Sequence, residues 1–121
     1  MNIDFSHYKD KEEPGRFLPD EIRRRIKGTE QDIYLKRYRE IEATIRVTIG
    51  KEFAGELKYT MVPHLGTFIW DTFVMEKYRL QGVGMALSQK LKDEVVKYSA
   101  TPVMGKVTSE AREFWGKAGY V

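Results

Sequence analysis

A glycine turn in the middle of the chain carries the residues best suited to chemistry. Arg79, Gly82 and Gly84 have the spacing Arg-x-x-Gly-x-Gly, which begins five residues after Val74. Glycines allow the backbone to approach a ligand closely, and the first amides of a following helix have no intrahelical partner. These amides and the positive end of the helix dipole can bind a pyrophosphate without any catalytic side chain. The turn therefore predicts a site for a phosphorylated ligand.

Two other phosphate-binding motifs do not fit this turn. A Walker A loop requires Gly-Lys-Ser/Thr, but Met85 follows Gly84. A dinucleotide fingerprint requires a third glycine or alanine where Leu87 stands, and a long parallel continuation for which 121 residues are too few. The pattern Arg-x-x-Gly-x-Gly is the one that remains.

Two periodicities predict the elements that position the turn. After it, apolar residues recur every four positions and predict an amphipathic helix of about four turns: Val83, Leu87, Leu91 and Val95. Before it, residues 67–74 are apolar on both faces, as in a central strand covered on two sides. Alternating residues on both sides of Gly50-Lys51, over 41–49 and 53–61, predict an antiparallel hairpin.

Weaker patterns predict the other elements. In chain order they are a strand at 3–7, a charged loop at 8–16, a helix at 20–28, a helix from Thr29 whose inner side extends to Ile41, a strand at 102–107 and a helix at 111–117. The order is β-α-α-β-β-β-α-β-α. It predicts one α/β domain over residues 1–121, with a mixed central sheet flanked by helices.

Composition narrows the class of protein. No apolar run approaches the ~20 residues of a membrane span, and no signal-peptide pattern opens the chain. Without cysteine, and with only two distant histidines, we expect no metal site. The net charge of +3 suits an anionic ligand, and the basic run Arg23-Arg24-Arg25 fits a solvated helix face better than a nucleic-acid surface. We expect a cytoplasmic protein.

The turn and the end of the chain together resemble the GNAT superfamily of N-acetyltransferases. The family's acetyl-CoA motif, Val-x-Pro-x-Tyr-Arg-Gly-x-Gly-x-Gly, is similar to the run VMEKYRLQGVG at 74–84. Its later motif, Asn-x-x-Ala-x-x-Phe-Tyr-x-Lys-x-Gly-Phe, is similar to TSEAREFWGKAGY at 108–120. Before Thr67 only the order of elements agrees.

The resemblance implies acetyl-CoA as cosubstrate and a primary amine as acceptor, a small molecule or a peptide. It implies that the amine attacks the thioester directly, while the Val74 amide polarises the carbonyl. The residues that the resemblance assigns to the coenzyme are Val74, Met75, Glu76, Arg79, Leu80, Gln81, Gly82, Val83, Gly84, Met85, Thr108 and Trp115.

A base would help because the attacking amine must be neutral. Asp71 is the one carboxylate on the strand that ends at Val74, and burial beside Trp70 would make it a better base. The alternative is a strand aspartate held by neighbouring amides or an arginine. His64 fits a surface turn, and Trp70 and Phe114 fit the core.

Three departures from the family pattern support a second hypothesis. Trp115 stands where the family has its general acid tyrosine, and Thr108 replaces an asparagine that contacts the pantetheine arm. The chain ends at Val121, before two strands that usually wall the acceptor pocket, so we expect these to be absent or supplied by another subunit, as in a homodimer. The alternative function is a catalytically weakened module that binds coenzyme A or a protein partner.

Overall fold

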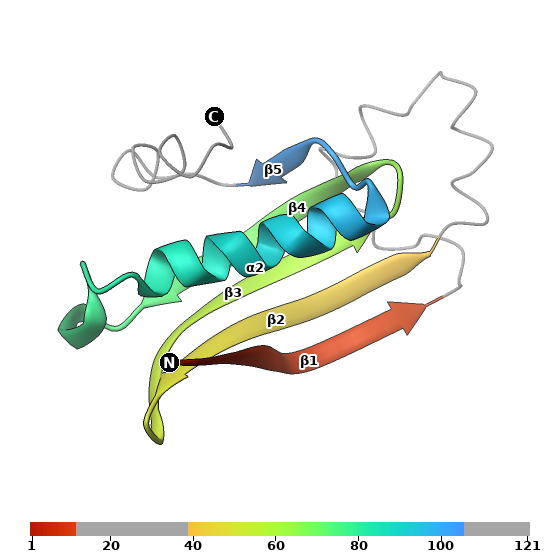
Figure 1. Cartoon of the computed structure of the whole chain (residues 1–121). Helices are drawn as coiled ribbons and strands as arrows, with labels where there is room; N and C mark the ends of the chain where they lie inside the picture. Colours follow the sequence, from red (N-terminus) through yellow and green to blue (C-terminus); the bar gives the residue numbers. More distant parts are fainter. Residues whose placement is uncertain (12–38, 106–121) are drawn as a thin grey trace.

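The computed structural model of the chain describes residues 1–11 and 39–105, which form a sheet with one long helix across it (Figure 1). Five strands lie in the order β1-β2-β3-β4-β5. Their bounds are Asn2–Lys11 for β1, Glu40–Ile49 for β2, Glu52–Val62 for β3, Gly66–Val74 for β4 and Val103–Gly105 for β5. The pairs β1–β2, β2–β3 and β3–β4 are antiparallel, and the pair β4–β5 is parallel, which confirms an α/β fold with a mixed sheet.

The hairpin β2–β3 is the best predicted part of the sheet. Gly50 has a φ of 65° in the connecting turn, where glycine costs least. The alternating residues of β2 are buried on the side that faces the helix: Ile41, Ala43, Ile45 and Val47. Ile41 belongs to β2, so its assignment to the inner side of a preceding helix is wrong. The helices expected at 20–28 and 111–117, and the start of the one expected at 29–41, lie outside the described residues.

Helix α2 (Val83–Tyr98) packs on β2 and β3, and its four-residue spacing is confirmed. Val83, Leu87, Leu91 and Val95 are all buried. Gly55 permits the close approach, since a Cβ there would lie 2.9 Å from Val83 Cγ1 and 2.8 Å from the Phe73 carbonyl oxygen. A side chain at this position of β3 would push away the start of α2, and with it the glycine turn.

Strand β1 is longer than its pattern indicates. The expected loop from Tyr8 is wrong, because β1 continues to Lys11. Phe5 pairs with Ile45 and His7 with Thr44, so Ser6 is an extra residue on β1. Such a bulge reverses the alternation of faces, and it turns Tyr8 instead of His7 toward α2.

Strand β4 is not covered on both sides along its whole length, contrary to expectation. Lys58 pairs with Asp71 and Tyr59 with Ile69, which makes Trp70 an extra residue. Trp70 is 52% exposed and Phe73 is 43% exposed, so the core role predicted for Trp70 is wrong. The indole Nε1 donates a hydrogen bond to Thr60 Oγ1 at 2.7 Å, which fixes the ring on the face away from α2.

The parallel strand β5 begins later than expected. Pairing with β4 runs from Thr67–Val103 to Ile69–Gly105, and Pro102 lies before the strand. Gly105 is the last residue that the structure describes there, so the far end of the expected strand at 102–107 is outside it.

Candidate functional site

The glycine turn joins the end of β4 to the start of α2. A short 3₁₀ turn, Glu76–Tyr78, follows Val74, and Gly82 then caps the helix with a φ of 84°. The first intrahelical bond runs from the Ala86 amide to the Gly82 carbonyl at 2.9 Å. The amides of residues 83–85 precede this bond and have no backbone acceptor within the described part of the chain. They form the concentration of unpaired donors that an anion requires.

Leu80 takes a glycine-like backbone conformation in this turn. Its φ is 63° and its side chain is fully exposed. The left-handed region costs a residue with a Cβ roughly 1–2 kcal/mol. Leu80 occupies the position at which the GNAT motif has its first glycine. The backbone therefore has a conformation that favours glycine at a residue where the motif has glycine and this sequence does not.

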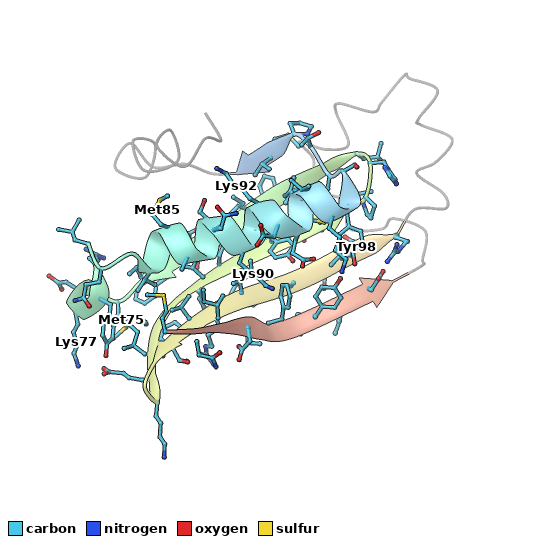
Figure 2. All side chains as sticks on the ribbon, viewed as in Figure 1. Met75, Lys77, Met85, Lys90, Lys92 and Tyr98 are labelled. Carbon is cyan, nitrogen blue, oxygen red and sulfur yellow. The ribbon has the colours of Figure 1, made fainter. Side chains whose placement is uncertain are left out.

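The other residues assigned to the coenzyme surround the turn. Arg79 is exposed, and its Nε donates to the Val74 carbonyl at 3.4 Å, which places its guanidinium beside the end of β4. Gln81 Nε2 donates to the Lys77 carbonyl at 3.0 Å. Figure 2 shows Lys77 near the start of α2. Three further members differ in exposure: Met75 is half-buried, Glu76 is exposed and Met85 is 49% exposed.

The backbone amide of Val74 points away from β3. The next amide, of Met75, donates to the Ala54 carbonyl of β3 at 2.8 Å. Because successive amides of a strand point to opposite edges, the Val74 amide points toward the edge on which β5 lies. The described pairing of β5 ends at Ile69, five residues before Val74. This orientation is the one required for contact with a ligand at that edge.

Three residues that hold the turn were missed in the sequence. Glu52 Oε2 accepts hydrogen bonds from Tyr78 Oη at 2.5 Å and from Lys77 Nζ at 3.0 Å. The bonds from Tyr78 and Lys77 lower the pKa of Glu52, and the same carboxylate raises the pKa of both partners. Glu52 lies at the tip of the β2–β3 hairpin, far from the turn in sequence, and no motif links the two.

The proposed base is placed differently from expectation. Asp71 is exposed, so the burial that would have favoured it as a base is not found. It lies on the same face as Phe73, away from α2, and opposite Lys58 in the register. His64 is an exposed turn residue with a φ of 68°, as expected. Thr108, Phe114 and Trp115 lie outside the described residues.

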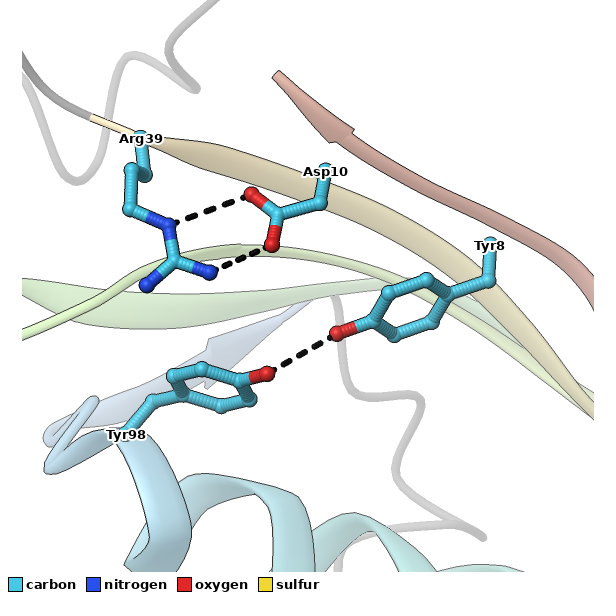
Figure 3. A network of polar contacts seen from close by, with 4 residues as sticks. All are labelled: Tyr8, Asp10, Arg39 and Tyr98. Atoms are coloured by element: carbon cyan, nitrogen blue, oxygen red, sulfur yellow. Dashed lines mark hydrogen bonds and ion pairs between the residues drawn. The ribbon is translucent and has the colours of Figure 1, made fainter. Parts of the chain in front are cut away.

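A second polar cluster lies at the other end of α2 (Figure 3). The hydroxyls of Tyr8 and Tyr98 are 3.1 Å apart, and the Arg39 guanidinium forms an ion pair with Asp10. Burial and the Tyr98 hydroxyl raise the pKa of Tyr8. Burial also raises the pKa of Tyr59, whose hydroxyl is buried without a hydrogen-bond partner in the described structure. These contacts connect β1 to the last turn of the helix.

Residues 1–11 and 39–105 contain neither a cluster suited to a metal ion nor a helix suited to span a membrane. No group of three or more histidine or acidic side chains there could hold a metal ion. None of the described helices combines the length and the apolar character needed to cross a bilayer.

Comparisons with solved structures support the fold. No protein-family model and no curated protein sequence matches the chain. The ribosomal-protein-alanine N-acetyltransferase from Brucella melitensis biovar Abortus 2308 is similar in structure, with a TM-score of 0.54 and 14% identity over 63% of this chain and 60% of that one. The match therefore spans less than two thirds of that relative.

Two further structures resemble the chain over more of its length. A transcriptional regulator from Bacillus halodurans C-125 has a TM-score of 0.60 and 18% identity, over 86% of this chain and 71% of that one. The glucosamine-6-phosphate N-acetyltransferase from Arabidopsis thaliana has a TM-score of 0.53 and 13% identity, over 94% and 91%. At these identities the likeness establishes architecture alone. With the mixed sheet, the helix across it and the glycine turn between β4 and α2, the chain has the GNAT fold.

Proposed function

We propose that residues 1–121 form one acetyltransferase domain that transfers an acetyl group from acetyl-CoA to a primary amine. The observation that carries the proposal is the set of amides at residues 83–85, which have no acceptor within the described residues and follow the glycine turn between β4 and α2. Amides at a helix N-terminus favour a pyrophosphate through hydrogen bonds and through the helix dipole. Arg79 adds a positive charge beside the end of β4, where its Nε donates to the Val74 carbonyl.

The chemical step proposed is direct attack of the amine on the thioester carbonyl. The new C–N bond forms as the C–S bond breaks, and the coenzyme leaves as a thiolate. The Val74 amide would stabilise the oxyanion, a contribution of a few kcal/mol in comparable sites. Trp115 cannot donate a proton to the leaving group, but a thiol of pKa ~8.5 is a tolerable leaving group without one. The exposed Asp71 would accept the amine proton, directly or through water.

The proposed acceptor is a small molecule or a peptide that carries a primary amine. The names of two structural neighbours specify such acceptors, glucosamine 6-phosphate in one and a protein alanine in the other. We place the protein in the cytoplasm, as a monomer or a homodimer, and without a nucleic-acid partner.

A thermal-shift titration tests the coenzyme site. Acetyl-CoA and coenzyme A at ~100 times their dissociation constants should each add about 2.7 kcal/mol to the free energy of unfolding, and ATP should add less. ATP serves as the control because it shares the adenine nucleotide but lacks the pantetheine arm. Equal stabilisation by all three would indicate a general nucleotide site, and no stabilisation would refute the proposal.

An assay of thiol release tests the base. Asp71→Asn should lower turnover by ~10²-fold or more, with coenzyme affinity nearly unchanged. The matched control is Asp93→Asn, an exposed aspartate on α2 that accepts a hydrogen bond from Gln89 at 3.0 Å. Polyamines, peptides and aminoglycosides would be offered as acceptors. Full activity of Asp71→Asn would remove this residue from the mechanism.

The second candidate function is a module that binds coenzyme A or a protein partner without acetyl transfer. Trp115 and Thr108, at positions where the family has its acid and its pantetheine contact, favour it. The name of one structural neighbour is that of a transcriptional regulator. Tight coenzyme binding with no thiol release for any acceptor would favour the module over the enzyme.

A further inference from the structure

Three residues near the tip of the β2–β3 hairpin, Glu52, Ala54 and Gly55, contact the segment between β4 and α2 that contains the glycine turn. Glu52 binds Tyr78 and Lys77 through its carboxylate. The Ala54 carbonyl accepts from the Met75 amide at 2.8 Å. Gly55 lies against the first residue of α2. Ala54 makes its contact through its backbone, and the contact at Gly55 depends on the absence of a Cβ. Among these three residues, Glu52 is therefore the one that acts through its side chain.

The Glu52 link acts at the least supported part of the turn. The 3₁₀ turn is otherwise held by its own local bonds, such as that from the Arg79 amide to the Glu76 carbonyl at 3.2 Å. The Tyr78 ring is 8% exposed and packs with the core, so its hydroxyl and Glu52 meet in a fixed place. Hydrogen bonds to a carboxylate are about twice as strong as those between neutral groups.

The charge of Glu52 is the wrong sign for attraction of a phosphorylated ligand. A carboxylate near an anion site opposes binding by Coulomb repulsion, although Lys77 offsets this charge at 3.0 Å. A contribution of Glu52 to coenzyme affinity therefore has to come from geometry.

Building on the proposed function, we infer that Glu52 is a positioning residue for the coenzyme site. Through Tyr78 and Lys77 it fixes the 3₁₀ turn, and thereby the amides of residues 83–85 and the Arg79 guanidinium. The hairpin tip thus sets the affinity for the coenzyme although it lies outside the motif.

The test is the dissociation constant of coenzyme A, measured by calorimetry on the full chain. Tyr78→Phe, which removes only the hydroxyl, should weaken binding about five- to tenfold, and Glu52→Ala by at least as much. Glu52→Gln keeps an acceptor for Tyr78 and should lie between wild type and Glu52→Ala. The double variant Glu52→Ala with Tyr78→Phe should bind no more weakly than Glu52→Ala alone, because both remove one link.

The matched control is Tyr98→Phe, which removes the contact between the Tyr98 and Tyr8 hydroxyls at the far end of α2. It should change the dissociation constant less than twofold, even where it lowers the melting temperature as much as Tyr78→Phe does. Hydrogen exchange without ligand gives a second readout, and the hydrogen-bonded amides of Met75 and Arg79 should exchange faster in Tyr78→Phe and not in Tyr98→Phe.

The outcomes separate the inference from the function on which it rests. Wild-type binding of coenzyme A with unchanged affinity in Tyr78→Phe and Glu52→Ala would overturn the positioning role and leave the proposed function standing. Absence of wild-type binding would overturn both. Equal weakening in Tyr98→Phe would show that the loss is a general effect of stability, which also overturns the inference.

Discussion

The two ends of α2 differ in whether their backbone polar groups have hydrogen-bond partners. At the C-terminal end, carbonyls of the last turn accept backbone hydrogen bonds: the Ala100 amide donates to the Val95 carbonyl at 3.0 Å, and the His64 amide to the Tyr98 carbonyl at 3.1 Å. At the N-terminal end the amides of residues 83–85 have no acceptor in the described structure. Within the described residues, the fold supplies hydrogen-bond partners at one end of the helix and none to the amides of residues 83–85 at the other.

The side chains at the two ends differ in the same sense. The C-terminal end is joined to β1 by a contact between neutral hydroxyls, Tyr8 with Tyr98. The N-terminal end is joined to β3 by the Glu52 carboxylate, which binds the phenol of Tyr78 and the ammonium of Lys77. Unpaired amides bind a ligand well only if their positions are fixed in advance. A carboxylate forms this link at the end that has the open amides, whereas the charged group at the other end, Arg39 paired with Asp10, contacts the helix through the face of the Tyr98 ring.

The largest effect should come from a negative charge at the open end. Gly82→Asp places a carboxylate where the pyrophosphate would lie, and coenzyme binding should weaken by more than ~100-fold while the far-UV circular dichroism spectrum remains folded. Gly82 has a φ of 84°, and a Cβ there would meet no atom within 4 Å, so strain comes from the backbone alone.

A matched substitution isolates the charge. Gly82→Asn has nearly the shape of aspartate and tolerates the left-handed region, but it is neutral. It should bind coenzyme more tightly than Gly82→Asp. Equal affinities for the two variants and the wild type would show that the turn is only a helix cap and that the ends of α2 do not differ in function.

The closed end should affect stability without affecting binding. Thr67 Oγ1 donates to the Ala100 carbonyl at 2.9 Å in a buried position just after α2. Thr67→Val keeps the volume but leaves this carbonyl unpaired, and urea denaturation should show a loss of about 1–2 kcal/mol. Thr67→Ser, which keeps the hydroxyl, is the control for the bond itself. A change in coenzyme affinity of more than twofold in Thr67→Val would contradict the division between the ends.

The groups Tyr8 and Glu52, one at each end, should lose their contributions to stability at opposite extremes of pH. The pKa of Tyr8 is raised above its ordinary value of 10.0, so its contribution is present below ~10 and is lost as the pH rises. The pKa of Glu52 is lowered, so its contribution is present above ~4.3 and is lost as the pH falls. In urea denaturation across pH, Tyr8→Phe should flatten the alkaline limb and Glu52→Gln the acid limb. Tyr8→Phe should leave the acid limb unchanged, whereas Glu52→Gln should also flatten part of the alkaline limb, because Glu52 raises the pKa of Tyr78 and Lys77.

The elements that carry this comparison were predictable from the sequence, because each has a simple repeat. The four-residue spacing of Leu87 and Leu91 predicts α2, and the alternation around Ile45 and Val47 predicts β2. The glycine turn was predictable because Gly82 and Gly84 interrupt both patterns. Local backbone preference and burial act in the same direction in these segments.

The contacts that fix the ends were not predictable, because they depend on register. The extra residue Ser6 turns Tyr8 toward α2, and the extra residue Trp70 places Val74 on the same face as Ile69. A bulge has no periodic pattern, and one inserted residue exchanges the two faces of a strand. The contact of Glu52 with Tyr78 joins residues far apart in sequence and has no motif of its own.

The prediction with the smallest expected effect tests whether the side chain of Leu80, the strained residue before the open end, contacts the ligand. Leu80 and Ser99 both have positive φ, 63° and 51°, on either side of α2. Leu80→Gly relieves roughly 1–2 kcal/mol of backbone strain, but glycine costs roughly 0.5–1 kcal/mol more entropy on folding. The free energy of unfolding should therefore rise by about 0.5 kcal/mol, and Ser99→Gly, its counterpart at the closed end, should gain a similar amount. Because the Leu80 side chain is fully exposed, coenzyme affinity should stay within twofold in Leu80→Gly and in Leu80→Ala, which keeps the strain. Weaker binding in both variants would show instead that the leucine side chain contacts the ligand, and that the two ends differ in what their strained residues do as well as in their open amides.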